Sequence, residues 1–437
     1  MRVAKGRCLR LCRPPAPGAE HGKEFWLSEA SLSYRQLLRL PDVRELLLAA
    51  CLSRLAERMF MLAIILHALD RFHSAALAGW VAFCSLAPGM MISPLAGALL
   101  DRVGASRGIV VDMAASATLL AVLVTLDLVG AASLPLLLAL VALYSLTSPL
   151  SAAGIRTLIP RLVPERALHR GNALDTGTYA LIDVLGPLVA GVLSGLAGTD
   201  VAMLVIAALY VTASVSVAPL ARREPRRTES RSRSMLREAV GGVAYVTRHP
   251  ALRGLAVSYA LYQVSWGILI VAVPVFTARE LSAGPTADAV VGALWAASGI
   301  CAALGALLAG RMRLLERERR FVVAGTLATA LAIYPLSAHP GLPGLAVGLS
   351  LVGFLAGPVD VGLLTLRQRC TEPDWLGRVL AISMSLNMSG LPLGTALGGL
   401  LVTRSLSAAL AAAAMASLLS ALGAHVLIPA RSRQSGS

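Results

Sequence analysis

Charged residues are scarce in this chain of 437 residues: Asp, Glu, Lys and Arg together make up only 14% of it. Soluble globular proteins contain about 25%. The hydrophobic share is 56%, and the mean hydropathy is +0.72. A water-soluble domain could not bury so much apolar surface. The composition therefore excludes an ordinary soluble protein and predicts that the chain lies in a lipid bilayer.

Cysteine is also rare, and its spacing excludes the common cysteine-based sites. The six cysteines show no paired pattern suited to a disulfide framework or a zinc site, so we expect unpaired thiols. The sequence has no P-loop, no dinucleotide-binding glycine pattern and no HExxH, and its histidines are scattered. We therefore expect no enzymatic activity, no metal and no cofactor.

Long apolar runs fill most of the chain. A helix needs about 20 apolar residues to cross about 30 Å of hydrocarbon. We count twelve candidate spans between Leu46 and Ile428, the second at Ala75 to Leu100 and the fifth at Thr176 to Ala197. The predicted fold class is an all-α integral membrane protein with twelve transmembrane helices.

The two halves of the chain share one plan. A single offset along the sequence places Arg102 on Arg311, Pro149 on Pro358 and Pro164 on Pro373, at matching points of the predicted topology. We therefore expect two pseudo-symmetric six-helix bundles. The predicted domains are a cytoplasmic tail (1–43), the first bundle (44–220), a basic cytoplasmic linker (221–250), the second bundle (251–428) and a second cytoplasmic tail (429–437).

The formal charge of +15 would suit nucleic acid, but the positions of the charges argue against that partner. Arg71, Arg279 and Arg404 fall in loops of one side, and Arg54 and Arg58 fall within the first span. The other lysines and arginines lie in the tails and in alternate loops on the opposite side. This is the positive-inside pattern. It predicts a multi-pass plasma-membrane protein with both termini in the cytoplasm and no bound nucleic acid.

The stretch GALLDRVGASR concentrates charge between the second and third spans. Gly97 allows close packing at the end of a helix, Asp101 can face the positive end of another helix, and Gly104 permits a tight reversal. With Arg102, these residues predict a cytoplasmic latch that favours one of two conformations. The alternative is a turn that serves only to set the membrane topology.

Gly97, Asp101, Arg102 and Gly104 resemble the GxxxDRxG motif of the major facilitator superfamily. Further matches are Pro160, Pro164, the GNAL of residues 171–174, and Gly186, Pro187 and Gly191. Together they resemble the exporter branch for drugs, macrolides and siderophores such as enterobactin. The resemblance implies the major facilitator fold, alternating access, and a latch partner at the start of span eleven, near Arg378.

Charges within the predicted spans are the candidates for ion coupling. Glu57 lies near the middle of span one, and we expect it to pair with Arg54, three positions earlier. Either Glu57 carries the coupling proton, or it forms a structural ion pair. Asp183, about halfway along span five, is the second candidate.

A polar and aromatic stripe marks a candidate substrate surface on span seven. Tyr259, Tyr262 and Trp266 recur at helical spacing with Gln263 beside them. The alternative is ordinary helix packing. The other cavity candidates are Arg54, Arg58 and Asn387, and the helix-packing candidates are Gly186, Pro187, Gly191, Gly394 and Gly398.

These features predict a monomeric secondary active exporter of small amphipathic molecules. Its partners would be the lipid bilayer, a small-molecule substrate and a coupling proton that moves by antiport, because carboxylates lie at membrane depth. One alternative is an importer or uniporter of a small metabolite. Another is a transport-inactive membrane sensor or scaffold.

Overall fold

The structure, a computed structural model, describes residues 34–164, 167–224, 244–311, 318–333, 341–371, 383 and 385–429. The regular elements within these ranges are helices. In chain order they are α2 (Tyr34–Leu38), α3 (Pro41–Phe72), α4 (Ala75–Cys84), α5 (Ala87–Val103), α6 (Ala105–Leu128), α7 (Leu134–Leu162), α8 (Leu168–Ala197), α9 (Thr199–Arg223), α11 (Pro250–Leu281), α12 (Pro285–Arg311), α13 (Glu318–Ala332), α15 (Leu342–Arg369), α17 (Gly390–Arg404) and α18 (Leu406–Leu427).

Within these ranges, nine helices are long and apolar enough to cross a membrane. Prolines begin several of them, including α3 at Pro41 and α11 at Pro250. Proline suits the first helical turn because its missing N–H would have no partner there. The chain is thus a multi-pass, all-α membrane protein, as its composition predicts.

The predicted second span, Ala75 to Leu100, is interrupted. It forms α4 and α5, with the break at Ser85 and Leu86. Pro88 lies in the first turn of the second piece, and proline cannot donate the hydrogen bond that would continue the first. Gly89 then donates its N–H to Ser145 Oγ of α7 (2.9 Å). The N–H group of Gly89, at the start of α5 after the break, thus finds its acceptor on α7.

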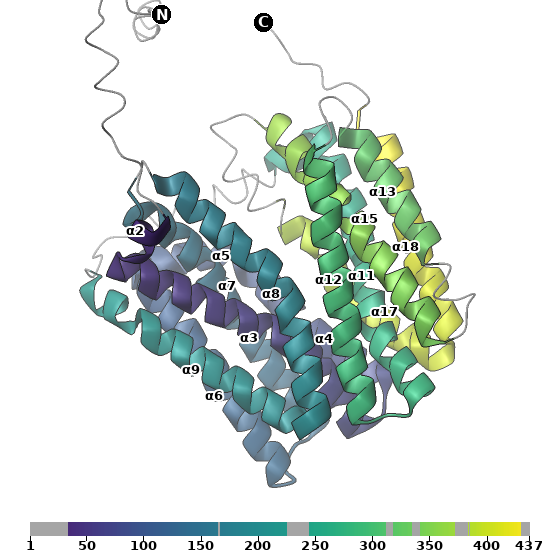
Figure 1. Ribbon diagram of the computed structural model, residues 1–437, viewed down its shortest axis with the longest axis horizontal. Helices are drawn as coiled ribbons and strands as arrows, with labels where there is room; N and C mark the ends of the chain where they lie inside the picture. The colour runs from purple at the N-terminus through teal and green to yellow at the C-terminus, as the bar shows by residue number, and fades with distance from the viewer. Residues whose placement is uncertain are drawn as a thin grey trace, which may run out of the picture.

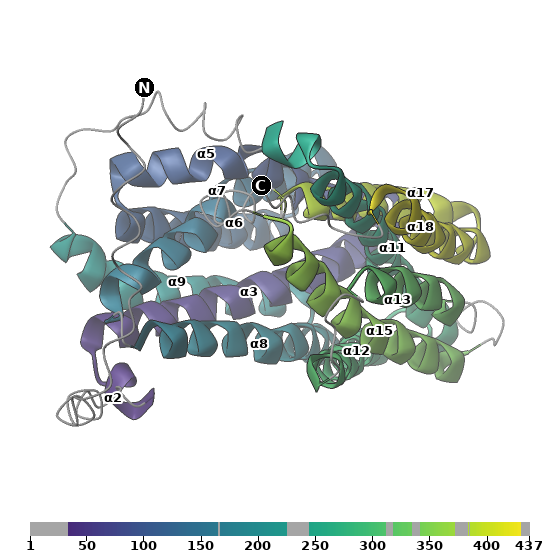
Figure 2. The ribbon, with the colours of Figure 1, turned by 90° about the horizontal axis from the view of Figure 1, so that it is seen from above.

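The described helices form two groups that lie together toward one end. Figure 1 shows the rest of α2 to α9 on the left, α11 to α18 on the right, and α4 between them. The view from above, in Figure 2, keeps the groups side by side. They diverge at the end where α3 and α11 begin, called the splayed side below, and converge at the opposite end, called the packed side.

Glycines allow the two groups to touch on the packed side. Helix α8 crosses α12 there, and α4 crosses α17. A Cβ atom at Gly191 of α8 would lie 2.6 Å from the Cα of Gly292 of α12. One at Gly79 of α4 would lie 2.9 Å from the Cα of Gly399 of α17. Backbones approach this closely only where side chains are absent.

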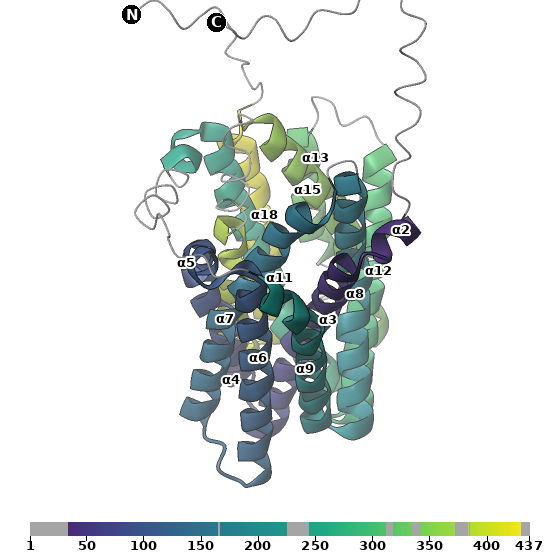
Figure 3. The same ribbon diagram turned by 90° about the vertical axis from the view of Figure 1, so that its left-hand side faces the viewer.

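The turn between α5 and α6 is stabilised by the residue that follows α9. Gly104, the turn residue, has a φ of +96°, a conformation that favours glycine. The Glu224 carboxylate accepts hydrogen bonds from the backbone N–H groups of Ala105 (3.1 Å) and Ser106 (2.8 Å). Arg107 donates to the Glu224 carbonyl (2.8 Å). Glu224 therefore caps the positive end of α6. Figure 3 views the molecule from the side of this first group.

Candidate functional site

A cavity of about 330 Å³ lies between the two groups of helices. Helices α3 and α8 contribute one wall, and α11, α12, α15 and α17 contribute the others. Its residues are Arg58, Met61, Leu62, Asp183, Pro187, Tyr259, Tyr262, Gln263, Trp266, Ile270, Trp295, Ser298, Gly299, Ala302, Ala356, Asp360, Met388 and Leu391. The volume lies within the range of small-molecule pockets, about 300–1,000 Å³.

The wall from the first group carries an ion pair. Arg58 Nε of α3 lies 2.7 Å from Asp183 Oδ1 of α8. Both side chains are about half exposed, because they border the cavity. Gly186 lies one turn beyond Asp183, and a Cβ there would collide with Arg58. This glycine therefore lets α8 approach α3 closely enough for the pair to form.

The wall from the second group carries another carboxylate. Tyr259 of α11 donates its hydroxyl to Asp360 Oδ1 of α15 at 2.5 Å. Behind it, Arg367 is buried next to Asn387. In the amide orientation that satisfies both groups, Asn387 accepts from Arg367 and donates to the carbonyl of Ser383 (3.0 Å). Each group thus presents one aspartate to the cavity, held by a partner from another helix.

Aromatic rings form much of the remaining wall. The Trp266 ring of α11 lies 6.0 Å from the Trp295 ring of α12 and 6.4 Å from the Tyr262 ring. Gln263 donates from Nε2 to Met388 Sδ (3.1 Å). Flat apolar surface beside a few fixed polar groups binds amphipathic organic molecules. The two carboxylates can each carry a proton or pair with a cation.

Two cavity candidates predicted from the sequence lie elsewhere. Arg54 is buried and forms an ion pair with Asp175 of α8, with Nη2 and Oδ1 2.6 Å apart. It also donates to Thr178 Oγ1 (2.8 Å) and stacks on the Tyr179 ring. The Asn387 side chain accepts a hydrogen bond from Arg367 in the amide orientation described above. Both side chains are tied to neighbouring helices and do not line the cavity.

The expected pairing of Glu57 with Arg54 is absent. Arg54 points to α8, where Asp175 and Thr178 already occupy it. Glu57 is exposed, and no ion pair joins it to another described residue. It also does not line the cavity. Spacing along one helix identified neighbours of Arg54 but not the stronger partner on another helix.

The residues of the predicted latch lie at the α5–α6 turn. Gly97 and Asp101 belong to α5, in a part whose side chains are not described, and Arg102 is exposed. Gly104 is the turn residue that precedes α6, whose first N–H groups bond to Glu224. The expected partner, Arg378, lies outside the described residues.

The remaining packing candidates lie where helices touch. Pro187 lines the cavity, and Gly191 and Gly195 face α12. On α17, Gly394 lies against Gly267 of α11, and Gly398 lies against Ile268. These contacts hold α17 to α11, which carries the aromatic stripe.

Sequence reasoning missed the wall contributed by α12. Trp295, Ser298, Gly299 and Ala302 recur at i, i+3, i+4 and i+7 and line the cavity together. This helical spacing was available as a signal. The pairing of Asp360 with Tyr259 was not, because it depends on how α11 packs against α15.

Comparison with known proteins agrees with this architecture. The family model of the Major Facilitator Superfamily matches residues 46–252 and 255–437. The chain is 47% identical over 403 residues to an uncharacterized MFS-type transporter, y4rN, of Sinorhizobium fredii, covering 92% of this chain and 98% of the relative.

More distant relatives have named activities. The multidrug efflux pump Tap of Mycolicibacterium fortuitum is 26% identical, with 75% of this chain and 80% of the pump covered. The enterobactin exporter EntS of Shigella boydii is 26% identical, with 57% and 59% covered.

A crystal structure of the peptide transporter POT aligns with a TM-score of 0.69 at 14% identity, covering 87% of this chain and 92% of that one. This likeness shows the fold. The family and fold predicted from the sequence motifs are confirmed: the chain belongs to the Major Facilitator Superfamily.

Proposed function

We propose that this chain exports small amphipathic molecules by alternating access, driven by proton antiport. The observation that carries the proposal is the cavity between the two groups of helices, with an aspartate on each wall and aromatic rings between them. The relatives named as efflux proteins support export as the direction.

The arrangement of the groups supports alternating access. Glycine crossings close the packed side, whereas the groups diverge on the splayed side. The positive-inside pattern supports a cytoplasmic position of the splayed side, so this conformation would receive substrate from within the cell. Rocking the two groups about the cavity would then release it on the packed side.

Asp183 is the coupling carboxylate in this proposal. A proton on Asp183 removes its attraction to Arg58 and leaves the arginine charge without a partner. Proton binding therefore changes the energy of the contact between α3 and α8 beside the substrate. Glu57, the other candidate, does not border the cavity and has no described ion-pair partner.

The test compares Asp183→Asn with Glu57→Gln in reconstituted vesicles under an imposed pH gradient. Each change removes one titratable carboxylate, so the variants are matched. We expect Asp183→Asn to abolish gradient-driven accumulation of a fluorescent amphipathic substrate while binding persists, and Glu57→Gln to transport normally. If Asp183→Asn concentrates substrate at the wild-type rate, Asp183 has no part in coupling.

A compound panel tests export itself. Expression in a sensitive host should raise resistance to several amphipathic compounds. Unchanged susceptibility together with faster uptake of a labelled solute would favour the importer or uniporter alternative.

Cysteines introduced at Ser74 and Thr228 test the orientation of the chain in the membrane. An impermeant thiol reagent added to intact cells should label the cysteine at position 74 and not the one at position 228.

A further inference from the structure

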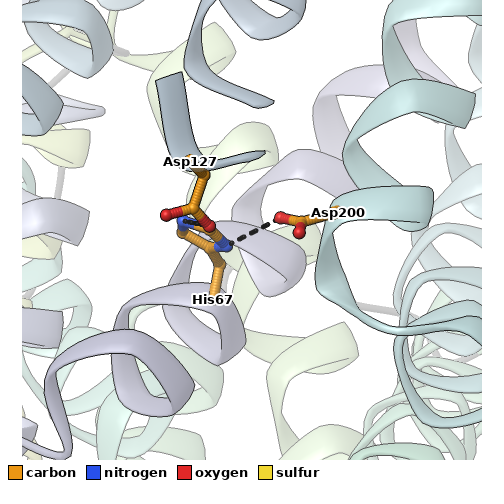
Figure 4. Close-up of side chains that lie close together, drawn as sticks. All are labelled: His67, Asp127 and Asp200. Carbon is orange, nitrogen blue, oxygen red and sulfur yellow. Dashed lines mark ion pairs between the residues drawn. The ribbon is translucent and has the colours of Figure 1, made fainter. Parts of the chain in front are cut away.

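A second polar cluster lies at the packed side, within the first group of helices. His67 lies near the end of α3, Asp127 near the end of α6, and Asp200 in the first turn of α9. Figure 4 shows the two carboxylates directed toward the imidazole ring from different helices. One ligand atom from each residue lies within 4.8 Å of the others.

The two ring nitrogens of His67 have different surroundings. Nδ1 lies 3.2 Å from Thr199 Oγ1 and 3.6 Å from Asp200 Oδ1. Nε2 lies 3.8 Å from Asp127 Oδ2. The Thr199 hydroxyl can accept a proton from Nδ1 or donate one to it, so this contact fits either tautomer. In the tautomer with the proton on Nδ1, Nε2 directs a lone pair toward the Asp127 carboxylate, and two acceptors face each other.

The spacing of these acceptors suits a metal ion better than a shared proton. A hydrogen bond between nitrogen and oxygen spans about 2.7–3.2 Å, which is shorter than the 3.8 Å between Nε2 and Asp127 Oδ2. Imidazole nitrogen and carboxylate oxygen each lie about 2.0–2.2 Å from a bound Zn²⁺. Two such ligands are therefore more than 3 Å apart, and small rotamer changes would bring the cluster to that geometry.

The electrostatic balance also calls for a cation. Arg71 Nε lies 3.0 Å from Asp127 Oδ1 and neutralises one carboxylate. The formal charges of Asp127, Asp200 and Arg71 sum to −1 when the imidazole is neutral. Oδ1 of Asp200 is buried and has no hydrogen-bond partner, whereas Oδ1 of Asp127 has Arg71 as its ion-pair partner. Buried carboxylate oxygens are normally paired or bound to a metal.

We infer that His67, Asp127 and Asp200 bind a divalent transition-metal ion. One imidazole and two carboxylates suit ions such as Zn²⁺ or Mn²⁺ better than Ca²⁺ or Mg²⁺, which prefer oxygen alone. The bond from Nδ1 to Thr199 would fix the ring orientation, as outer partners of metal-bound histidines do. The inference rests on the cluster and is independent of the transport proposal.

Two hollows border residues of the cluster or residues next to it. His67 and Arg71 border a small cavity of about 10 Å³, which is close to the room that one water ligand needs. Thr199 borders a larger hollow of about 820 Å³ on the packed side. The Asp200 side chain is 37% exposed, so it can receive an ion from solvent. The bound ion would tie the ends of α3, α6 and α9 together.

Zinc binding by the purified full chain tests the inference. The protein should carry a tag without histidine, be stripped with EDTA and be desalted after addition of Zn²⁺. Inductively coupled plasma mass spectrometry should then find about one Zn²⁺ per chain, and Zn²⁺ should raise the melting temperature. His67→Gln and Asp200→Asn should abolish both effects, and Thr199→Val should weaken binding about tenfold.

His73→Asn is the matched control. His73 is an exposed histidine next to the end of α3, and asparagine tolerates its positive φ of 49°. This variant should bind Zn²⁺ as the wild type does. Asp200→Asn keeps the test valid if His67→Gln fails to fold. Failure of the wild type to bind Zn²⁺ overturns the inference. Zn²⁺ binding that is retained by a folded Asp200→Asn variant also overturns it. The same holds if acid stabilises the metal-free protein while Zn²⁺ leaves its melting temperature unchanged.

Discussion

Replacing Gly191 with alanine should open the packed side. An added Cβ would lie 2.6 Å from the Asp288 carbonyl oxygen and 2.6 Å from the Cα of Gly292, whereas ordinary contacts begin at 3.4 Å. Helices α8 and α12 must therefore separate by up to about 1 Å, and such overpacking costs about 1–3 kcal/mol. The gain in helix propensity applies to both conformations and does not change their ratio. The population of the separated state should rise about 5- to 150-fold.

A cysteine at Ser194 reports this change. Ser194 is 4% exposed and lies on α8 between Gly191 and Gly195. In nanodiscs, with the native cysteines replaced by serine, Gly191→Ala should raise the rate of maleimide labelling at this position at least about fivefold. Gly423→Ala is the control, because the nearest atom to its added Cβ would be 3.9 Å away. Labelling of Gly191→Ala at the parent rate would refute the idea that this crossing holds the packed side closed.

Three further changes test contacts within the first group. Glu224→Gln should lower the stability of the N-terminal end of α6 by about 1 kcal/mol, because the capping charge is lost. Hydrogen exchange at the amides of Ala105 and Ser106 measures this loss, and unchanged protection of these amides would contradict it. Asp175→Asn should lower the free energy of unfolding by about 3 kcal/mol, because Arg54 keeps its charge without its ion-pair partner; a denaturant titration showing no loss would exclude that role. Asp101→Asn should reduce transport more than expression, and a fully active variant would make Asp101 a bystander.

Apolar run length was enough to predict the membrane fold. Helices need only about 20 apolar residues to span the bilayer, and the sequence shows this directly. The spacing of Tyr259, Tyr262 and Trp266 also predicts a common helix face, and all three border the cavity. Periodicity finds such groups because neighbours on one face of a helix are fixed by local geometry.

Partners on different helices could not be predicted in this way. Arg54 lies near Glu57 in sequence, yet it pairs with Asp175, more than a hundred residues away. Asp360 pairs with Tyr259, and His67 gathers Asp127 and Asp200, through the packing of separate helices. Isolated carboxylates within apolar segments cannot be told apart by sequence alone. The choice of partner depends on crossing angles and glycine contacts that a single segment does not contain.

Because Glu224 contacts α6, the position at which the chain is divided into two fragments matters. Glu224 directly follows α9, and its carboxylate caps the N-terminal end of α6. A fragment that holds the first group of helices therefore includes this cap only if it extends through Glu224. A fragment that stops at Arg223 would leave two N–H groups of α6 without their acceptor. If the gene is cut into two co-expressed pieces, a cut after Glu224 should therefore yield a first fragment that folds and reassembles better than a cut one residue earlier.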